Sequence, residues 1–136
     1  TNLEPQLAFD RGDFLAKLIN YVPEAVYKEK LSKIKGLLAE PDKARVAIEL
    51  GNGIEAFNSV PTAIYSFLTH SDSFAQAVVN AVSLGGDTDT IGAMTGAISG
   101  AYLGIESIPN SWEGKLENRF YLKELAGKLW ELKTTA

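Results

Sequence analysis

Two aspartates and two threonines alternate directly after a pair of glycines, in the segment Gly85-Gly86-Asp87-Thr88-Asp89-Thr90. Their carboxylate and hydroxyl oxygens are hard donors of the kind that bind Mg²⁺, Mn²⁺ or Ca²⁺. A loop that only capped a helix would need one such side chain. The positive end of a helix dipole repels a bare cation, so a metal here needs other anions nearby. The residue types alone leave two hypotheses open, a cation site and a decorated helix cap.

The elements that must position this segment are helices, because apolar residues recur at spacings of three and four with almost no alternation. The periodicity and the cap residues predict four helices in the first half of the chain, over 13–22, 23–39, 42–50 and 59–69. A fifth helix is expected to be capped by Ser71 or Asp72 and to run to 84. Two more helices follow, one over 91–104 and a last one that includes 120–130 after a Ser111 cap. Gly51 is expected to end the third of these in a left-handed conformation. The fold class is therefore all-α.

Four glycines recur every fourth residue in the predicted helix 91–104, at Gly92, Gly96, Gly100 and Gly104. Four residues advance a helix by about 400°, so the glycines form one stripe. Each costs about 1 kcal/mol relative to alanine, and we expect the stripe to let a neighbouring helix approach closely. The same pattern occurs in membrane dimers, but this apolar run is too short to span a bilayer.

Composition limits the classes of partner. The chain has 136 residues, a formal net charge of −4 and no cysteine. The negative charge argues against nucleic-acid binding, which rewards clustered Lys and Arg. Without cysteine there are no disulfides or thiol nucleophiles, which fits a cytoplasmic protein, and no secretion signal or membrane span is evident. The first residue is Thr1 rather than Met, so we expect the chain to begin inside a longer product.

Other residues that could do chemistry are better explained by structure. His70, the single histidine, ends a predicted helix, where its charged form would favour the dipole. Glu49 and Glu55 flank a glycine turn and could serve as acids, but acids beside loops are usually solvated. Trp112 and Trp130 lie at helical spacings among apolar residues and are expected to pack.

Residues 80–102, NAVSLGGDTDTIGAMTGAISGAY, resemble the C-terminal metal motif of the ADP-ribosylglycohydrolase family. Residues 50–54 and 59–65 resemble the ADP-ribose-contacting segment of the branch that acts on ADP-ribosyl-serine and poly(ADP-ribose). The arginine-directed branch is similar around 86–90 and less so upstream. The resemblance implies a compact orthogonal helical bundle around a pair of divalent cations.

The resemblance also implies roles for particular residues. Asp87, Asp89 and Thr90 would bind two Mg²⁺ ions, with Mn²⁺ or Ca²⁺ as alternatives. Gly53, Ile54 and Ser59 would contact ADP-ribose. The expected reaction is metal-dependent hydrolysis of the O- or N-glycosidic bond between ADP-ribose and a protein residue, serine favoured, or of poly(ADP-ribose).

One part of the family pattern is missing, because nothing before Leu50 matches its first acidic metal motif or its catalytic glutamate. Residues 1–136 are therefore expected to be the C-terminal part of one helical domain. The N-terminal half would be its partner and would supply the catalytic residue. Three alternatives stay open: an ADP-ribose-binding pseudoenzyme, an arginine-directed hydrolase, and a structural domain in which the acidic segment is only a cap.

Overall fold

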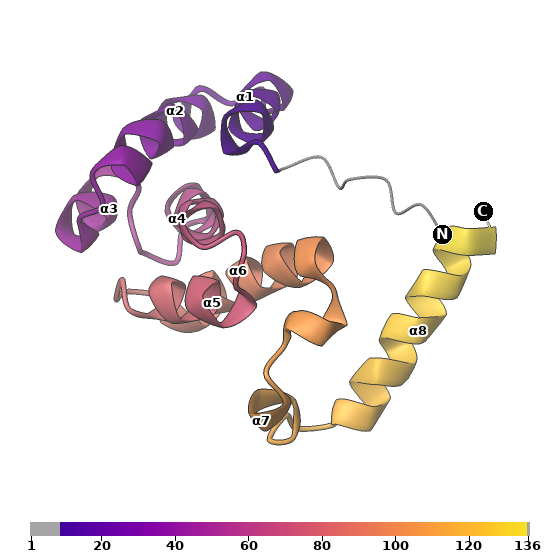
Figure 1. Ribbon diagram of the computed structural model, residues 1–136. Helices are drawn as coiled ribbons and strands as arrows, with labels where there is room; N and C mark the ends of the chain where they lie inside the picture. The colour runs from indigo at the N-terminus through magenta and orange to yellow at the C-terminus, as the bar shows by residue number, and fades with distance from the viewer. Residues whose placement is uncertain (1–8, 136) are drawn as a thin grey trace.

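The computed structural model describes residues 9–135, and this part of the chain folds entirely into helices and connecting turns (Figure 1). The helices are α1 (Arg11–Tyr21), α2 (Ala25–Ala39), α3 (Lys43–Glu49), α4 (Ala56–Thr69), α5 (Phe74–Val82), α6 (Thr88–Leu103), the 3₁₀ helix η1 (Ile105–Ser107), α7 (Asn110–Glu113) and α8 (Arg119–Thr135). The predicted all-α helical bundle is confirmed. Within 9–135, no helix combines the length and the apolar character needed to cross a membrane. The ends of the predicted range, 1–8 and 136, lie outside the described residues.

Helix α4 lies at the centre of the bundle, with α2 on one side and α5 and α6 on the other (Figure 1). Eight consecutive residues, 61–68, are buried, so α4 has no solvent-facing stripe over this stretch. Its apolar side chains share a core with Leu31, Ile34 and Leu37 of α2 and with the end of α3. A helix that is buried all round is apolar on every face, and residues 60–68 are uncharged and mostly apolar, with Thr62 and Ser66 as the small polar exceptions.

Helix α4 begins earlier than the sequence predicts. Its first residue is Ala56, and the carbonyl of Glu55 accepts the amides of Asn58 and Ser59 at 2.8 and 3.0 Å. The predicted start at residue 59 is therefore wrong. Proline commonly occupies the first turn of a helix, but here Pro61 lies inside α4.

Two predicted caps are also corrected. The N-cap of α5 is Ser73, whose hydroxyl accepts the Gln76 amide at 3.3 Å, rather than Ser71 or Asp72. Ser111 lies within α7 instead of capping a later helix. Several adjacent residues with hydroxyl or carboxylate side chains can each cap a helix, and only the packed bundle selects one of them.

The glycine stripe of α6 faces α5, as predicted. A Cβ built on Gly92 would lie 3.0 Å from Val82 Cγ1, and one on Gly96 would lie 3.7 Å from Phe74 and Val78 of α5. At Gly100 the nearest atom is again Phe74, at 3.6 Å. Gly104 is different, because it ends α6 with φ of 82° and has no atom within 4 Å of such a Cβ. The stripe that receives α5 therefore has three members.

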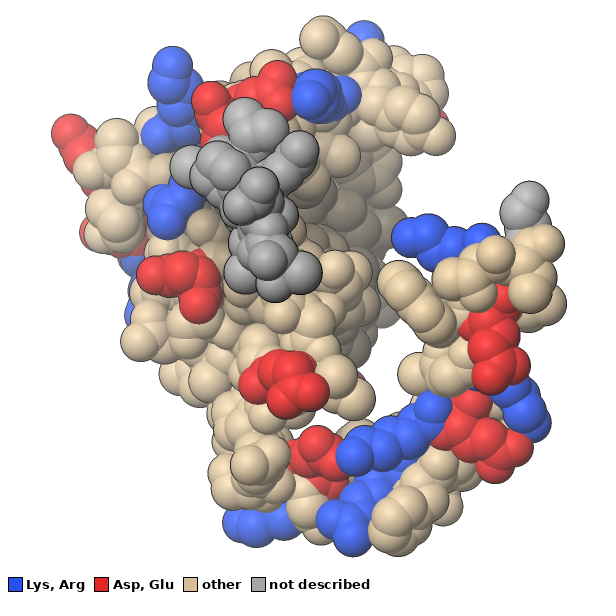
Figure 2. All heavy atoms as spheres, turned by 45° about the vertical axis from the view of Figure 1, so that its right-hand side comes forward, with Lys and Arg blue, Asp and Glu red and all other residues tan. Residues whose placement is uncertain are grey.

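Helix α8 stands apart from the other helices (Figure 1). None of its residues is buried, and Phe120, Leu129 and Trp130 are 75%, 68% and 64% exposed. The expected packing of Trp130 is thus not found, whereas Trp112 packs edge-on against Phe74 of α5. Figure 2 shows a hollow between α8 and the main body, with acidic and basic side chains interspersed along the helix. Apolar side chains from α5, α8 and the segment between α6 and α8 line an open groove: Phe74, Ile105, Ile108, Trp112, Leu116 and Leu122.

Candidate functional site

The turn that follows α3 is held by three different helices or helix ends. Its three successive carbonyls, at residues 50, 51 and 52, each accept a hydrogen bond from elsewhere in the chain. The donors are Lys30 Nζ of α2 to Leu50 at 2.7 Å, Thr62 Oγ1 of α4 to Gly51 at 2.5 Å, and the amide of Asp87, at the start of α6, to Asn52 at 2.8 Å. Gly51 has φ of 88°, which confirms its predicted left-handed conformation after α3.

The third of these bonds joins the two segments that the sequence singled out. Asn52 accepts the Asp87 amide, and its own side chain donates to the Leu84 carbonyl at 3.0 Å. Gly86 makes this contact possible, because a Cβ on it would overlap the Asn52 carbonyl oxygen. Gly85 and Gly86 also have φ of 75° and 72°, a region that disfavours other residues. The turn at 51–53 and the loop at 85–87 therefore form one unit.

Asp87 occupies the N-cap position of α6 without acting as a side-chain cap. The equivalent residues of α1 and α3, Asp10 and Asp42, each accept an amide of their first turn, at 2.9 and 3.0 Å. No such bond is made by the Asp87 side chain. Its carboxyl group instead faces that of Asp89. This geometry weakens the alternative that Asp87 is only a cap.

Asp89 lies in the exposed first turn of α6. A hydrogen bond from the Asp87 carboxyl, followed by hydrogen bonds from backbone amides, lowers the pKa of Asp89 below its usual value. One of these amides is that of Thr90, which lies 3.0 Å from Asp89 Oδ1. Two carboxyl groups this close repel each other when both are ionised, unless a proton or a cation lies between them. The pair can therefore serve as part of a cation site.

The side-chain oxygens of the acidic segment are of the kind that a divalent cation binds, but there are too few of them to fill its coordination shell. Asp87, Asp89 and Thr90 offer hard oxygens on adjacent residues, whereas Mg²⁺ takes six. Within residues 9–135, no group of three or more His, Cys, Asp or Glu side chains is placed to hold a metal ion. The remaining ligands would have to be water, substrate or residues outside the described part.

The predicted substrate-contacting residues lie on either side of the start of α4. Gly53 is half-buried directly after Asn52, and Ile54 is 79% exposed beside it. Both are therefore close in the chain to the joined loops. Ser59 is buried, and its hydroxyl donates back to the Glu55 carbonyl at 3.3 Å. The structure thus brings Gly53 to the loop of Asp87 through Asn52 and leaves Ser59 on the inner side of α4.

The two glutamates beside the turn have partners of their own. Glu49 accepts a hydrogen bond from Arg45 Nε at 3.0 Å. The pKa of Glu55 is lowered, first by its own backbone amide and then by Asn58. An acid that protonates a leaving group needs a raised pKa, so Glu55 is poorly suited to that role. His70 is the C-cap residue of α4, as predicted.

Three residues that hold this unit together were given no individual role from the sequence: Lys30, Asn52 and Thr62. Asn52 between two glycines is typical of any turn, and Thr62 lies within an apolar run. Lys30 is one of four lysines within residues 28–35, a run that has the pattern of a solvated helix face. Nothing local in the sequence distinguishes the lysine that turns inward, because its partners are 20 and 28 residues away.

The sequence is similar to known proteins over most of its length. Residues 6–136 match the family model described as ADP-ribosylglycohydrolase. The chain is 47% identical over 106 residues to ADP-ribosylhydrolase ARH3 of Bos taurus, covering 69% of this chain and 29% of that protein. It is 39% identical over 132 residues to ARH3 of Danio rerio, and this match covers 86% of this chain and 35% of that protein. A shorter match, 42% over 53 residues, covers 39% of this chain and 17% of the ADP-ribosyl-[dinitrogen reductase] glycohydrolase of Rhodospirillum rubrum. The chain spans about a third of the length of the ARH3 proteins.

Proposed function

Since this chain belongs to the ADP-ribosylglycohydrolase family, we propose that it is the C-terminal part of an enzyme that hydrolyses the bond between ADP-ribose and its acceptor. The observation that carries the proposal is the hydrogen-bonded unit of the turn 51–53 and the loop 85–87. Gly53 and the exposed Ile54 directly follow Asn52, whose carbonyl accepts the amide of Asp87, and this supports a site that would combine them with the carboxylates of Asp87 and Asp89. That combination suits a ligand with an apolar base, a ribose and a diphosphate.

Each part of the unit has a distinct role in the proposed site. Asp87, Asp89 and Thr90 would hold part of a shell for two Mg²⁺ ions, with Mn²⁺ or Ca²⁺ as alternatives. When bound, the cations would polarise ribose oxygens beside the scissile bond. Gly53 lets the ligand approach the backbone, and Ile54 offers an apolar surface to it.

Proton transfer is assigned to another part of the protein. Among the described residues, the two glutamates nearest to the turn are paired with Arg45 or Asn58. A glutamate of the N-terminal half, as the family resemblance implies, would handle the proton. The complete protein is therefore required for turnover, and this chain alone would bind Mg²⁺ and ADP-ribose weakly and self-associate through its exposed apolar surface.

The acceptor that we favour is serine, or a further ADP-ribose unit in poly(ADP-ribose). The resemblance at 50–54 and 59–65 to the branch with those substrates supports this choice, and the match to the dinitrogen reductase glycohydrolase is shorter. An arginine acceptor is the second candidate, since the acidic segment is shared by both branches.

The test is ADP-ribose release from a serine-modified peptide, an arginine-modified peptide and poly(ADP-ribose), with and without Mg²⁺. We expect the complete protein to release ADP-ribose from the serine peptide only with Mg²⁺, and this chain to release none. Binding of ADP-ribose without release from any substrate would identify a pseudoenzyme. Release by this chain alone would overturn the half-enzyme proposal.

A further inference from the structure

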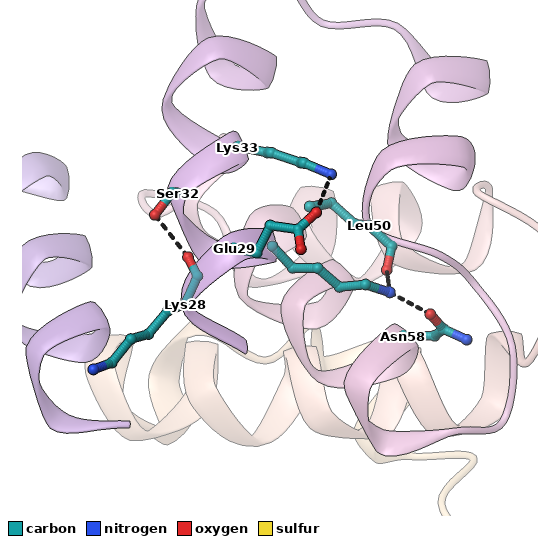
Figure 3. A network of polar contacts seen from close by, with 7 residues as sticks. Lys28, Glu29, Ser32, Lys33, Leu50 and Asn58 are labelled. Atoms are coloured by element: carbon teal, nitrogen blue, oxygen red, sulfur yellow. Dashed lines mark hydrogen bonds and ion pairs between the residues drawn. The ribbon is translucent and has the colours of Figure 1, made fainter. Parts of the chain in front are cut away.

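Lys30 is the one lysine of the run at 28–35 whose ammonium group is shown to bond to the turn. It extends from α2 to donate to the Leu50 carbonyl at 2.7 Å and to Asn58 Oδ1. Figure 3 draws both bonds as dashed lines, with Leu50 and Asn58 labelled. In contrast, Lys33 on the same helix pairs with Glu29 at 2.9 Å at the surface.

These bonds join the two ends of the segment between α3 and α4. Leu50 is the C-cap residue of α3, so its carbonyl lies at the negative end of that helix, where a cation is stabilised. Asn58 lies in the first turn of α4. The ammonium group also lies 5.1 Å from the centre of the Phe57 ring, within the range of a cation–π interaction. One side chain therefore fixes residues before and after the turn.

Asn58 transmits this restraint to the turn itself. Its side-chain nitrogen donates to Glu55 Oε2 at 3.0 Å. A Cβ built on Gly51 would overlap the Asn58 side chain, and one on Gly53 would lie 2.7 Å from Glu55 Oε2. The backbone at both glycines thus packs directly against the polar chain that runs from Lys30 through Asn58 to Glu55.

We infer that Lys30 is a positioning residue that holds the turn 51–54 in the conformation that binds ADP-ribose. The inference rests on the proposed function for the identity of the ligand. Lys30 acts through Leu50 and Asn58, which accept the two hydrogen bonds of its ammonium group. Burial, and then the nearby Lys33, lower the pKa of Lys30, which agrees with its inward position.

The test compares Lys30→Met with Lys33→Met in the complete protein. Both variants remove one ammonium group from α2 and keep an unbranched chain, but only the first loses the bonds to the turn. We expect Lys30→Met to raise the Kd for ADP-ribose, measured by isothermal titration, by about tenfold. This is the rise expected if the binding-competent turn is populated about one tenth of the time. KM should rise in parallel while kcat is largely kept, and Lys33→Met should match the parent in both.

Hydrogen exchange provides a readout that needs no ligand. We expect faster amide exchange at 50–58 in Lys30→Met and unchanged exchange in Lys33→Met. If Lys30→Met does not fold, Asn58→Ala provides a second test, because it removes the bond between Lys30 and Asn58 and keeps the bond between Lys30 and Leu50. We expect the same increases in Kd, KM and amide exchange in this variant. If a folded Lys30→Met variant has the same Kd, KM and amide exchange rates as the parent, Lys30 does not position the turn. A parent that binds no ADP-ribose would overturn the proposed function, whereas the exchange comparison would still decide whether Lys30 orders the turn.

Discussion

The joined turn and loop at 51–53 and 85–87 differ from α8 in what holds them. Every carbonyl from residue 50 to 52 is bonded to a donor from another part of the chain, although this region has little regular structure. Helix α8 has seventeen residues of regular structure and no buried side chain. Irregular backbone can thus be the more firmly held region, because its order comes from tertiary bonds, whereas a helix satisfies its own backbone without a partner.

Asp89→Ala tests whether the ordered unit serves catalysis. Asp89 is exposed, so we expect the free energy of unfolding of the complete protein to change by less than about 0.5 kcal/mol. Loss of a metal ligand should lower kcat/KM more than about 100-fold, because even residues that only support ligands cost 10 to 100-fold. The measurement is Mg²⁺-dependent ADP-ribose release, and activity equal to that of the parent would remove Asp89 from the site.

Gly86→Ala tests the contact between turn and loop. The added Cβ would overlap the Asn52 carbonyl oxygen and would sit on a residue with φ of 72°. We expect a loss of about 3 kcal/mol in the free energy of unfolding, from overpacking plus backbone strain. Gly85→Ala is the matched control, because φ is 75° there and the nearest atom is 3.7 Å away. Its expected loss is about 1 kcal/mol, and equal losses in urea titrations would show that the close contact contributes nothing.

Gly96→Leu tests the packing of α6 on α5 beside the unit. A Cβ at this position would already contact Phe74 and Val78 at 3.7 Å, so the larger leucine side chain would press against α5. We expect a loss of about 2 kcal/mol, although leucine is the better helix former. Gly104→Leu has open space instead, and its cost should come from its positive φ alone. The melting temperatures of both variants are compared with that of the parent. A Gly96→Leu variant that melts at the same temperature as the parent would contradict the close packing of α6 on α5.

Leu129→Ala tests whether α8 contributes to stability without a packing partner. Leu129 is 68% exposed on α8, so truncation in this chain should change the free energy of unfolding by no more than about 0.5 kcal/mol. Leu68→Ala in the buried α4 should cost about 2 to 5 kcal/mol in the same measurement. In the complete protein we expect Leu129→Ala to become more costly, because the N-terminal half would cover α8. An unchanged, small effect there would show that α8 stays uncovered.

The sequence predicts the helices well where apolar periodicity is regular, as along α2 and α3. It predicts helix starts less well where several capping residues compete, as at Ser71, Asp72 and Ser73. The acidic segment was identified from its residue types, and the glycine turn from its resemblance to the ADP-ribose-contacting segment of the family. Their pairing was not, because it depends on a backbone bond between Asn52 and Asp87, and backbone groups are the same in every residue. Lys30 was missed for a similar reason, since one lysine among several differs only in where the packed bundle directs it.

The bonds that hold the turn 51–53 also bear on the order of events in folding. The bonds of Gly51 with Thr62, of Leu50 with Lys30 and of the Asn52 side chain with Leu84 span 11, 20 and 32 positions in the chain. The helices around them need only neighbours four residues away. Closing such separations costs chain entropy, and contacts of this kind form late when folding follows the order of contact separation. In refolding experiments on the complete protein, the circular dichroism of the helices should therefore recover before the affinity for ADP-ribose.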